Sequence, residues 1–284
     1  MNPLQPAPSP DRYCVMGNPV AHSKSPWIHA RFAELTGQSL HYDKRLIALD
    51  GFAAGVSAFI TEGGRGCNIT VPFKFEAAAL ATHTSERALL AQACNILTFK
   101  DGQILADNSD GAGLVNDIQR NAGVALREKR VLLIGAGGAS AGVLGPLLQA
   151  QPAHITVANR TLAKATHLVG RHAALAMLQN TELLAQSLKG LEGDFDVIIN
   201  ASASSLAGAD VPVSGRALKP GALAYDMMYG PAADGFMTWA REHGAVPRDG
   251  LGMLVEQAAE AFLIWRGVLP PSQQVLAELR ADMA

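Results

Sequence analysis

The sequence predicts an α/β protein of two domains, one of them a Rossmann-like, doubly wound parallel sheet. Two observations support this prediction. Between residues 130 and 229, short apolar runs that suit buried parallel strands alternate with helix-forming stretches. One of these runs, VLLIG at 131–135, breaks directly into the glycine-rich stretch GAGGASAG. That is the place where a dinucleotide-binding unit turns from strand to helix. At 284 residues, the chain is long enough for two domains.

The composition indicates a protein with a large hydrophobic core and little net charge. Hydrophobic residues make up 49% of the chain, charged residues 17%, and the net charge is −2. The interspersed charges offer no basic surface for nucleic acid or an anionic membrane, and no run of ~18 apolar residues could span a bilayer. Cys14, Cys67 and Cys94 lack the spacing of a zinc site and are odd in number. We therefore expect no nucleic-acid or membrane partner, no metal and a cytoplasmic location. The proline-rich N-terminus MNPLQPAPSPD is expected to be a tail, not a signal peptide.

The first 110 residues predict a second, smaller α/β unit. Strands are expected at 12–17, at 40–49 and at the start of 66–74, and helices at 26–36 and 51–62. Ser25 is the expected N-cap of the first helix. A hairpin is expected at 95–99 and 103–106, around Asp101-Gly102. Near the other end of the chain, GAVPRDG at 244–250 is expected to be a polar turn that leads into a long amphipathic helix.

The stretch GCNITVPFK at 66–74 places a lysine at a helix start. Its strand part puts Asn68 and Thr70 on one face, because side chains alternate. Pro72 ends the strand and the helix-forming run FKFEAAALA follows, so Lys74 falls in the first helical turn. Exposed N–H groups disfavour a cation there, which makes Lys74 a candidate acid/base. From these residues alone, a lysine on a solvated helix face remains the alternative.

The glycine-rich stretch predicts a nucleotide site. Gly135 permits the tight turn, and Gly137 lets the backbone approach a pyrophosphate at the helix N-terminus. Gly138 follows, and Ser140 stands where the fingerprint usually has a third glycine or an alanine. The alternative is an ordinary glycine-rich turn between a strand and a helix.

The next strand indicates which dinucleotide would bind. NAD-binding sites usually place Asp or Glu at its end, but this chain continues with Asn159, Arg160 and Thr161, and Lys164 follows one turn later. Two cations suit a 2′-phosphate, which a carboxylate would repel. We therefore predict NADP as the cofactor. The alternative is that both cations are solvated surface charges.

Small polar side chains predict a site for a hydroxylated ligand. Ser23 and Ser25 are two apart in an expected extended loop, so both can face one pocket. Asn95 begins a strand, and Asp110 lies in NSDG. Gln257 interrupts the apolar stripe of the last long helix, where its amide needs a ligand or an internal partner. With one lysine, one carboxylate and no arginine cluster, the set suits a neutral polyhydroxylated ring that bears a carboxylate.

The motifs together resemble the shikimate dehydrogenase family over about residues 12–270. They are GNPVAHSKSP-x-x-H, NITVPFK, DNSDG-x-G, GAGGAS, NRT, YDMMY and DGLGMLVEQA, in this order. The resemblance implies NADP-dependent interconversion of shikimate and 3-dehydroshikimate in the shikimate pathway, which leads to chorismate and the aromatic amino acids. It also implies a substrate-binding domain of residues 1–110 and 250–284 around an NADP-binding domain of residues 111–249.

By motif position, the resemblance also implies the roles of individual residues. Lys74 and Asp110 look like the catalytic pair. The implied substrate ligands are Ser23, Ser25, Thr70, Asn95, Asp110, Tyr229 and Gln257. The implied NADP contacts are Gly135, Ala136, Gly137, Gly138, Ala139, Asn159, Arg160, Thr161, Lys164, Met227 and Gly250, with Glu86 a weaker candidate.

Three positions depart from the family pattern. Ser109 and Ile96 each stand where threonine is usual, and NASASSLAG lacks the usual glycine, which leaves the path of that loop open. We expect Lys74 to exchange a proton with the substrate oxygen while Asp110 orients it. Two alternatives stand beside this one: a broader quinate/shikimate dehydrogenase that uses NAD or NADP, and a catalytically silent metabolite-sensing protein. The sequence does not decide between a monomer and a homodimer.

Overall fold

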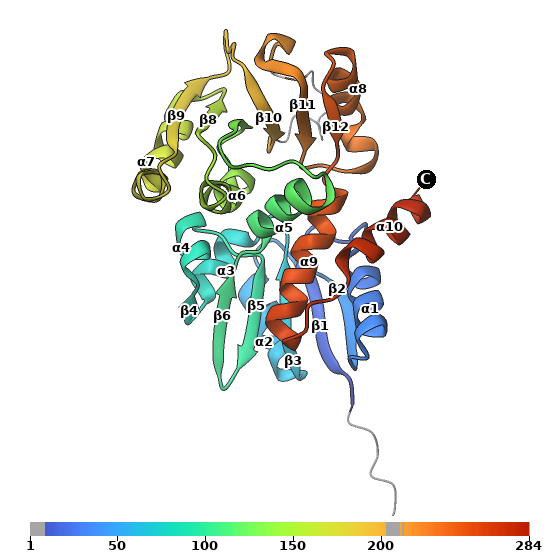
Figure 1. Ribbon diagram of the computed structural model, residues 1–284. Coiled ribbons are helices and arrows are strands. Elements are labelled where there is room, and N and C mark those ends of the chain that lie inside the picture. The colour runs from blue at the N-terminus through green and yellow to red at the C-terminus, as the bar shows by residue number, and fades with distance from the viewer. Residues whose placement is uncertain (1–8, 203–210, 212, 284) are drawn as a thin grey trace, which may run out of the picture.

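The computed structural model describes residues 9–202, 211 and 213–283, which form two α/β domains (Figure 1). Each domain is built on a six-stranded sheet with helices packed against it. The predicted fold class is therefore confirmed. Residues 1–8 of the predicted N-terminal tail, and residues 203–208 of the NASASSLAG loop, lie outside the described residues. The last residue of that predicted tail, Asp11, is instead the first residue of β1 (Asp11–Gly17). Within the described ranges, no helix has the length and apolar character needed to cross a bilayer.

The first sheet is mixed, with strand order β2-β1-β3-β5-β6-β4. Its strands are β1 (Asp11–Gly17), β2 (Leu40–Leu46), β3 (Gly64–Ile69), β4 (His83–Thr84), β5 (Ile96–Lys100) and β6 (Gln103–Asp107). The helices that follow them are α1 (Ser25–Thr36), α2 (Phe52–Thr61), α3 (Lys74–Leu80) and α4 (Glu86–Ala91). β1 pairs in parallel with β2 and β3, whereas β5 is antiparallel to β3 and β6. The predicted hairpin is thus present as β5 and β6.

The second sheet is entirely parallel, with strand order β12-β11-β10-β7-β8-β9. Its strands are β7 (Arg130–Ile134), β8 (His154–Asn159), β9 (Glu182–Ser187), β10 (Phe195–Asn200), β11 (Leu218–Asp226) and β12 (Val246–Arg248). Its main helices are α6 (Gly138–Gln149), α7 (Leu162–Leu178) and α8 (Asp234–Glu242). The chain starts at the centre with β7, runs outward to β9 and returns to β10 beside β7. Doubly wound sheets bind their ligands where the strand order reverses in this way.

The two edge strands of this sheet, β12 and β9, were not predicted from the sequence. The stretch GAVPRDG is not a turn: its central residues form β12. β9 was not predicted, and its residues alternate between exposed and half-buried. An edge strand has one strand neighbour and more contact with solvent, so it lacks the continuous apolar run that marks β7 and β10 as buried strands.

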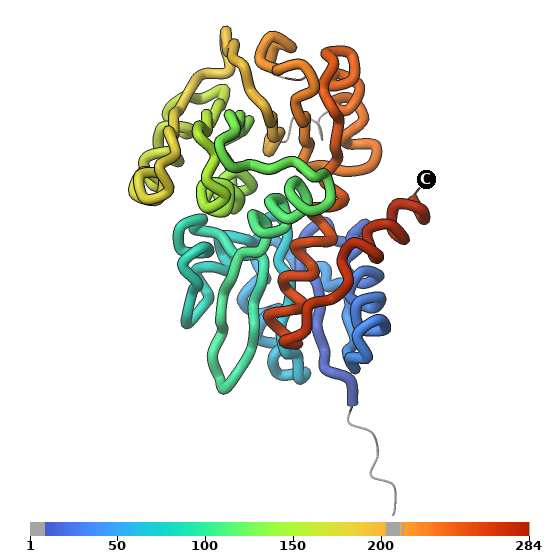
Figure 2. Tube along the Cα trace, viewed as in Figure 1, coloured from blue at the N-terminus to red at the C-terminus, as the bar shows by residue number. Residues whose placement is uncertain are grey.

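Two helices at the junction carry the chain between the domains. Figure 2 traces it through α5 (Asp110–Asn116) into the second domain, and back through α9 (Leu251–Arg266). α5 continues as a π-helical turn (Asp117–Asn121). The buried Asp117 carboxylate accepts hydrogen bonds from the Tyr225 hydroxyl (2.8 Å) and from Arg248 Nε (2.7 Å). A Cβ at Gly252 would lie 1.8 Å from Asp117 Oδ1, so only glycine fits where α9 crosses this carboxylate.

The last helix, α10 (Ser272–Met283), closes the first domain. It packs with α1 and α9 around an apolar cluster that includes Ile28, Phe32 and Phe262. Because α9 contributes to this cluster, the C-terminal segment rejoins the N-terminal domain and fixes the position of the residues on its first turns.

Candidate active site

The structure brings Lys74 and Asp110 into contact within the first domain, next to Gly142 of α6 in the second domain. Lys74 is the first residue of α3, as predicted, and Asp110 is the first residue of α5. Lys74 Nζ donates to Asp110 Oδ2 at 2.5 Å, although the two residues are 36 apart in sequence. The Asp110 side chain is 9% exposed and that of Lys74 is 25% exposed. The pair is therefore sheltered on the aspartate side and open to a ligand on the lysine side.

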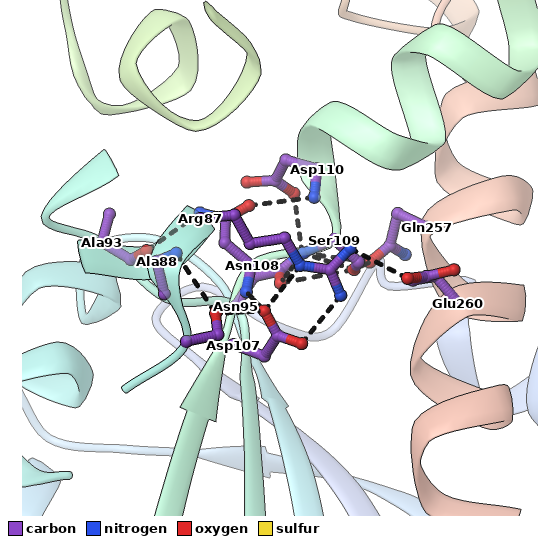
Figure 3. A network of polar contacts seen from close by, with 11 residues as sticks. Arg87, Ala88, Ala93, Asn95, Asp107, Asn108, Ser109, Asp110, Gln257 and Glu260 are labelled. Carbon is purple, nitrogen blue, oxygen red and sulfur yellow. Dashed lines mark hydrogen bonds and ion pairs between the residues drawn. The ribbon is translucent and has the colours of Figure 1, made fainter. Parts of the chain in front are cut away.

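Buried amides fix the Asp110 carboxylate (Figure 3). Asn95 Nδ2 donates to Asp110 Oδ1 at 2.8 Å and lies 3.3 Å from Gln257 Oε1. The Asp110 N–H donates to Asn108 Oδ1 at 3.0 Å. Gln257 Nε2 donates to the Leu254 carbonyl. This amide therefore has an internal hydrogen-bond partner, which was one of the two possibilities predicted for it. Each Asp110 oxygen has its own donor, which leaves the carboxylate one orientation.

An ion-pair network below Asp110 anchors the strand that leads to it (Figure 3). Arg87 on α4 donates to both oxygens of Asp107, at 2.6 and 2.7 Å, and to Glu260 of α9 at 2.9 Å. Burial alone would raise the pKa of Asp107, but hydrogen bonds from Arg87 and Ser85 hold it below its usual value. The charged carboxylate thereby ties α4 and α9 to the end of β6, three residues before Asp110.

Ser23 and Ser25 lie together, but not for the predicted reason. Ser23 Oγ donates to Ser25 Oγ at 3.2 Å and accepts from the Ser25 N–H at 3.3 Å. The loop is not extended, since Lys24 has φ −88° and ψ −5°. The prediction that Ser25 caps the helix was also wrong: Lys24 is the N-cap and Ser25 is the first helical residue. The helical backbone conformation of Lys24, and not an extended chain, brings the two hydroxyls within 3.2 Å of each other.

Asn68 and Thr70, at the end of β3, have different surroundings. The buried Asn68 side chain accepts from the Tyr42 hydroxyl at 2.7 Å and donates to the Asn95 carbonyl at 3.2 Å. Asn68 therefore links β3 to Tyr42 of β2 and to Asn95, the residue before β5. Thr70 is half-buried, and its methyl lies so near Gly17 that a Cβ there would come within 2.3 Å. This packing leaves Thr70 as the more accessible of the two.

The glycine turn has the geometry that a dinucleotide needs. Gly135 has φ +108°, a conformation that side chains rarely adopt. A Cβ at Gly137, the N-cap of α6, would meet nothing within 4 Å, so this backbone is open to a ligand. Ala136 and Ala139 are half-buried on either side of the turn. The N–H groups at the start of α6 are thus available to an anion.

Beyond the turn, Asn159, Arg160, Thr161 and Lys164 follow the end of β8. Asn159 Nδ2 donates to the Thr161 carbonyl at 2.9 Å, which shapes the turn into α7. Arg160 and Lys164 are exposed, and in the described part of the chain no carboxylate forms an ion pair with either. Two unpaired cations near this strand end are available to an anion.

The remaining predicted residues are Met227 and Tyr229 after β11, Gly250 at the start of α9, and Glu86 at the start of α4. Tyr229 is half-buried against the cluster of α1, α9 and α10, and burial raises its pKa. Gly250 is the N-cap of α9, and a Cβ there would lie 2.3 Å from the Met227 carbonyl oxygen. The backbones of Gly250 and Met227 therefore approach each other closely. Glu86 is exposed at the start of α4.

An open cavity of about 340 Å³ lies beside the glycine turn and is lined by residues of both domains. Phe75 and Ala91 line it from the first domain, and Gly137, Gly138, Ala163 and Lys164 from the second. His167 and Arg171 of α7 also line it, and the sequence analysis missed both. Their spacing of three and seven residues from Lys164 was an available signal, because that spacing places side chains on one helix face.

Three family models match the chain. The shikimate dehydrogenase substrate binding domain matches residues 15–97, shikimate / quinate 5-dehydrogenase matches 117–210, and the shikimate 5′-dehydrogenase C-terminal domain matches 250–280. A protein named shikimate dehydrogenase (NADP(+)) from Acidovorax sp. (strain JS42) is 67% identical, over 96% of this chain and 97% of its own length. The chain belongs to the shikimate dehydrogenase family. Ser109 stands where the family motif usually has threonine. This departure is conservative, because the Ser109 hydroxyl accepts a hydrogen bond from Asn95 Nδ2 at 3.1 Å.

Solved structures of this family share the fold over nearly the whole chain. An Ael1 enzyme from Pseudomonas putida is 47% identical, with a TM-score of 0.88, and covers 95% of this chain and 98% of its own. The shikimate 5-dehydrogenase of Thermus thermophilus in complex with NADP(H) and shikimate is 27% identical, with a TM-score of 0.82 and coverage of 95% and 99%. The 5-ketofructose reductase of Gluconobacter sp. strain CHM43 is 25% identical, again with a TM-score of 0.82, and covers 96% and 99%. One scaffold therefore serves more than one substrate, so the substrate has to be argued from the site.

Proposed function

We propose that this protein is an NADP-dependent shikimate dehydrogenase, which interconverts 3-dehydroshikimate and shikimate on the route to chorismate and the aromatic amino acids. The observation that carries the proposal is the 2.5 Å pair between Lys74 Nζ and Asp110 Oδ2. It lies against α6, the helix that begins at the glycine turn, since a Cβ at Gly142 would lie 3.4 Å from Asp110 Oδ2. The relative named as an NADP(+) shikimate dehydrogenase, 67% identical to this chain, supports the same substrate and cofactor.

The residues of the second domain fit NADP. The open backbone at Gly137 suits a pyrophosphate, and the unpaired Arg160 and Lys164 suit the 2′-phosphate. When bound, NADPH supplies a hydride to the carbonyl carbon of the substrate. The proposed contacts are Gly135 to Ala139, Asn159 to Thr161, Lys164, Met227 and Gly250. Glu86 is the weakest of these assignments, because it is exposed and does not line the cavity.

The first domain supplies the proton and holds the substrate. In the reductive direction, Lys74 Nζ donates a proton to the carbonyl oxygen of 3-dehydroshikimate; in the oxidative direction it accepts the hydroxyl proton. Asp110 keeps Lys74 Nζ in place and is itself held by Asn95. The hydroxyls and carboxylate of the ring are bound by Ser23, Ser25, Thr70, Asn95, Asp110, Tyr229 and Gln257. These groups are neutral donors and acceptors apart from Asp110, which suits a ring rich in hydroxyl groups.

We also propose the domain boundaries and the cellular location. Residues 1–110 and 250–284 form the substrate domain, and residues 111–249 the NADP domain, with the changes of domain at the start of α5 and just before α9. Cys14, Cys67 and Cys94 are free and buried. Free thiols are compatible with the reducing cytoplasm.

A steady-state assay of the purified protein tests the function. We expect NADP+ and shikimate to give a rise in NADPH absorbance, with kcat/KM higher for shikimate than for quinate and higher for NADP+ than for NAD+. Comparable values for both substrates or both cofactors would instead favour the broader quinate/shikimate dehydrogenase. Turnover of 5-ketofructose with NADPH, without turnover of shikimate, would instead indicate the reductase activity for which the Gluconobacter relative is named. Shikimate binding without turnover would favour a metabolite sensor.

A further inference from the structure

One face of α7 presents three basic side chains to the cavity between the domains. Lys164, His167 and Arg171 all line it, opposite the glycine turn at Gly137 and Gly138. No acidic side chain is among the described residues that line it. The volume of about 340 Å³ falls in the range of small-molecule sites, roughly 300–1,000 Å³. The α7 side of the cavity therefore offers basic side chains to an anionic group, whereas Phe75, Ala91 and Leu168 make other parts of its lining apolar.

The charge of Arg171 lacks a compensating carboxylate. Arg171 is half-buried, and burial lowers the pKa of its guanidinium. Its Nη2 donates to the carbonyl of Leu90 in α4, and no ion pair of Arg171 occurs within residues 9–202, 211 and 213–283. A neutral carbonyl offsets the desolvation of a cation less than an anion does. A guanidinium has five N–H donors, so the bond to Leu90 leaves others for a ligand in the cavity.

Arg171 is also a bridge between the domains. α7 belongs to the parallel sheet and α4 to the mixed sheet, and Figure 1 shows α4 directly below α6 and α7. Leu90 packs against the same region, since a Cβ at Gly145 of α6 would lie 3.2 Å from Leu90 Cδ2. A ligand that engages Arg171 would therefore contact a side chain already joined to the other domain.

We infer that His167 and Arg171 extend the cofactor site along α7 and bind a phosphate group of the dinucleotide together with Lys164. This inference rests on the proposed function, because the dinucleotide is the phosphate-bearing ligand that the neighbouring glycine turn suits. A guanidinium fork matches two phosphate oxygens at once, and His167 adds one ring N–H. The group bound is either the 2′-phosphate or the pyrophosphate. Arg171 couples its binding to the contact between α7 and α4.

Calorimetric titration of the full-length protein tests the inference without relying on turnover. Arg171→Gln should weaken NADP+ binding roughly tenfold, the scale of a charged hydrogen bond, and His167→Gln roughly threefold. The matched control is Arg241→Gln, which removes an exposed arginine from α8 of the same domain and should change Kd by less than about twofold. NAD+ distinguishes the two phosphates: a loss for NADP+ alone assigns the 2′-phosphate, and an equal loss for both cofactors assigns the pyrophosphate.

Salt dependence separates a charge contact from a structural effect. Wild-type affinity should fall as KCl rises, and Arg171→Gln should show a shallower fall, because one charge contact is gone. Unchanged NADP+ and NAD+ affinity in Arg171→Gln would overturn the inference, and so would a loss with the same salt dependence as wild type. The proposed function is judged separately: a wild-type protein that binds NADP+ but does not oxidise shikimate fails that proposal and leaves this one standing.

Discussion

Replacing Lys74 with alanine tests the proposed mechanism most directly. The substitution removes the α3 ammonium group that lies 2.5 Å from Asp110, on a side chain that is 25% exposed. A positioned acid/base is worth about 10²–10⁴-fold in rate, so kcat should fall at least ~10²-fold, or about 2.7 kcal/mol of activation free energy. KM for shikimate should change less than about threefold, because the hydroxyls and amides proposed to bind the ring are untouched.

The surroundings of Asp110 show that this variant should still fold. Asp110 Oδ1 keeps its 2.8 Å hydrogen bond from Asn95, and only Oδ2 loses its donor. Removing the cation from a mostly buried carboxylate costs up to about 3–5 kcal/mol, which is less than the roughly 5–15 kcal/mol by which most proteins are stable. Thermal unfolding followed by circular dichroism should therefore show a folded protein with a lowered Tm. The matched control is Lys100→Ala at the exposed end of β5, which should leave kcat unchanged.

The assay is steady-state oxidation of shikimate by NADP+, with each variant assayed well below its own Tm. A Lys74→Ala enzyme whose kcat stays within about threefold of wild type would refute the assignment of Lys74 as the proton donor and acceptor. A large rise in KM with kcat unchanged would also refute it, since that pattern belongs to a residue that only binds substrate.

Three further predictions test other parts of the molecule. Arg160→Asp places a carboxylate beside the proposed 2′-phosphate, so the ratio of kcat/KM for NADP+ to that for NAD+ should fall at least ~10-fold. Arg248→Ala leaves the buried Asp117 without its cation and should lower the unfolding free energy in urea by about 3–5 kcal/mol, whereas the exposed Arg280→Ala should cost less than about 1 kcal/mol. His29→Phe should flatten the dependence of stability on pH between about 5 and 7, as measured by urea unfolding at each pH.

The sign of the His29 effect follows from burial. Burial lowers the pKa of His29 to about 3, whereas an unfolded histidine has a pKa near 6.5. As the pH falls, the unfolded chain therefore binds the proton first. The stability that neutral His29 contributes to the folded protein is complete above about pH 6.5 and is lost as the pH falls towards 3. Between about pH 7 and pH 5 the loss from His29 is about 2 kcal/mol. Equal pH dependence in wild type and His29→Phe would contradict this origin.

The elements that were predicted correctly are those with a strong local signal. Lys74 was assigned to a first helical turn because Pro72 ends one element and a helix-forming run starts the next. The turn at Gly135 was recognised from an apolar strand that breaks into glycines. The strand β12 carries Pro247 and spans three residues, which is too little pattern to identify an edge strand. The Ser23–Ser25 loop was misjudged because no local rule fixes the conformation of Lys24.

The parts of the site that sequence did not reveal depend on how the two domains meet. A Cβ at Gly142, in the middle of α6, would lie 3.4 Å from Asp110 Oδ2 and 3.3 Å from Asn108 Nδ2. A Cβ at Gly111 would lie 2.7 Å from the Gly142 carbonyl oxygen. The helix that begins at the dinucleotide turn thus packs, through glycine, directly against the carboxylate that holds Lys74. Periodicity and spacing describe each helix alone, whereas this contact joins residues of different domains. Because one rigid helix reaches from the proposed pyrophosphate position to Asp110, the packing of α6 sets the distance between the cofactor and the proton donor.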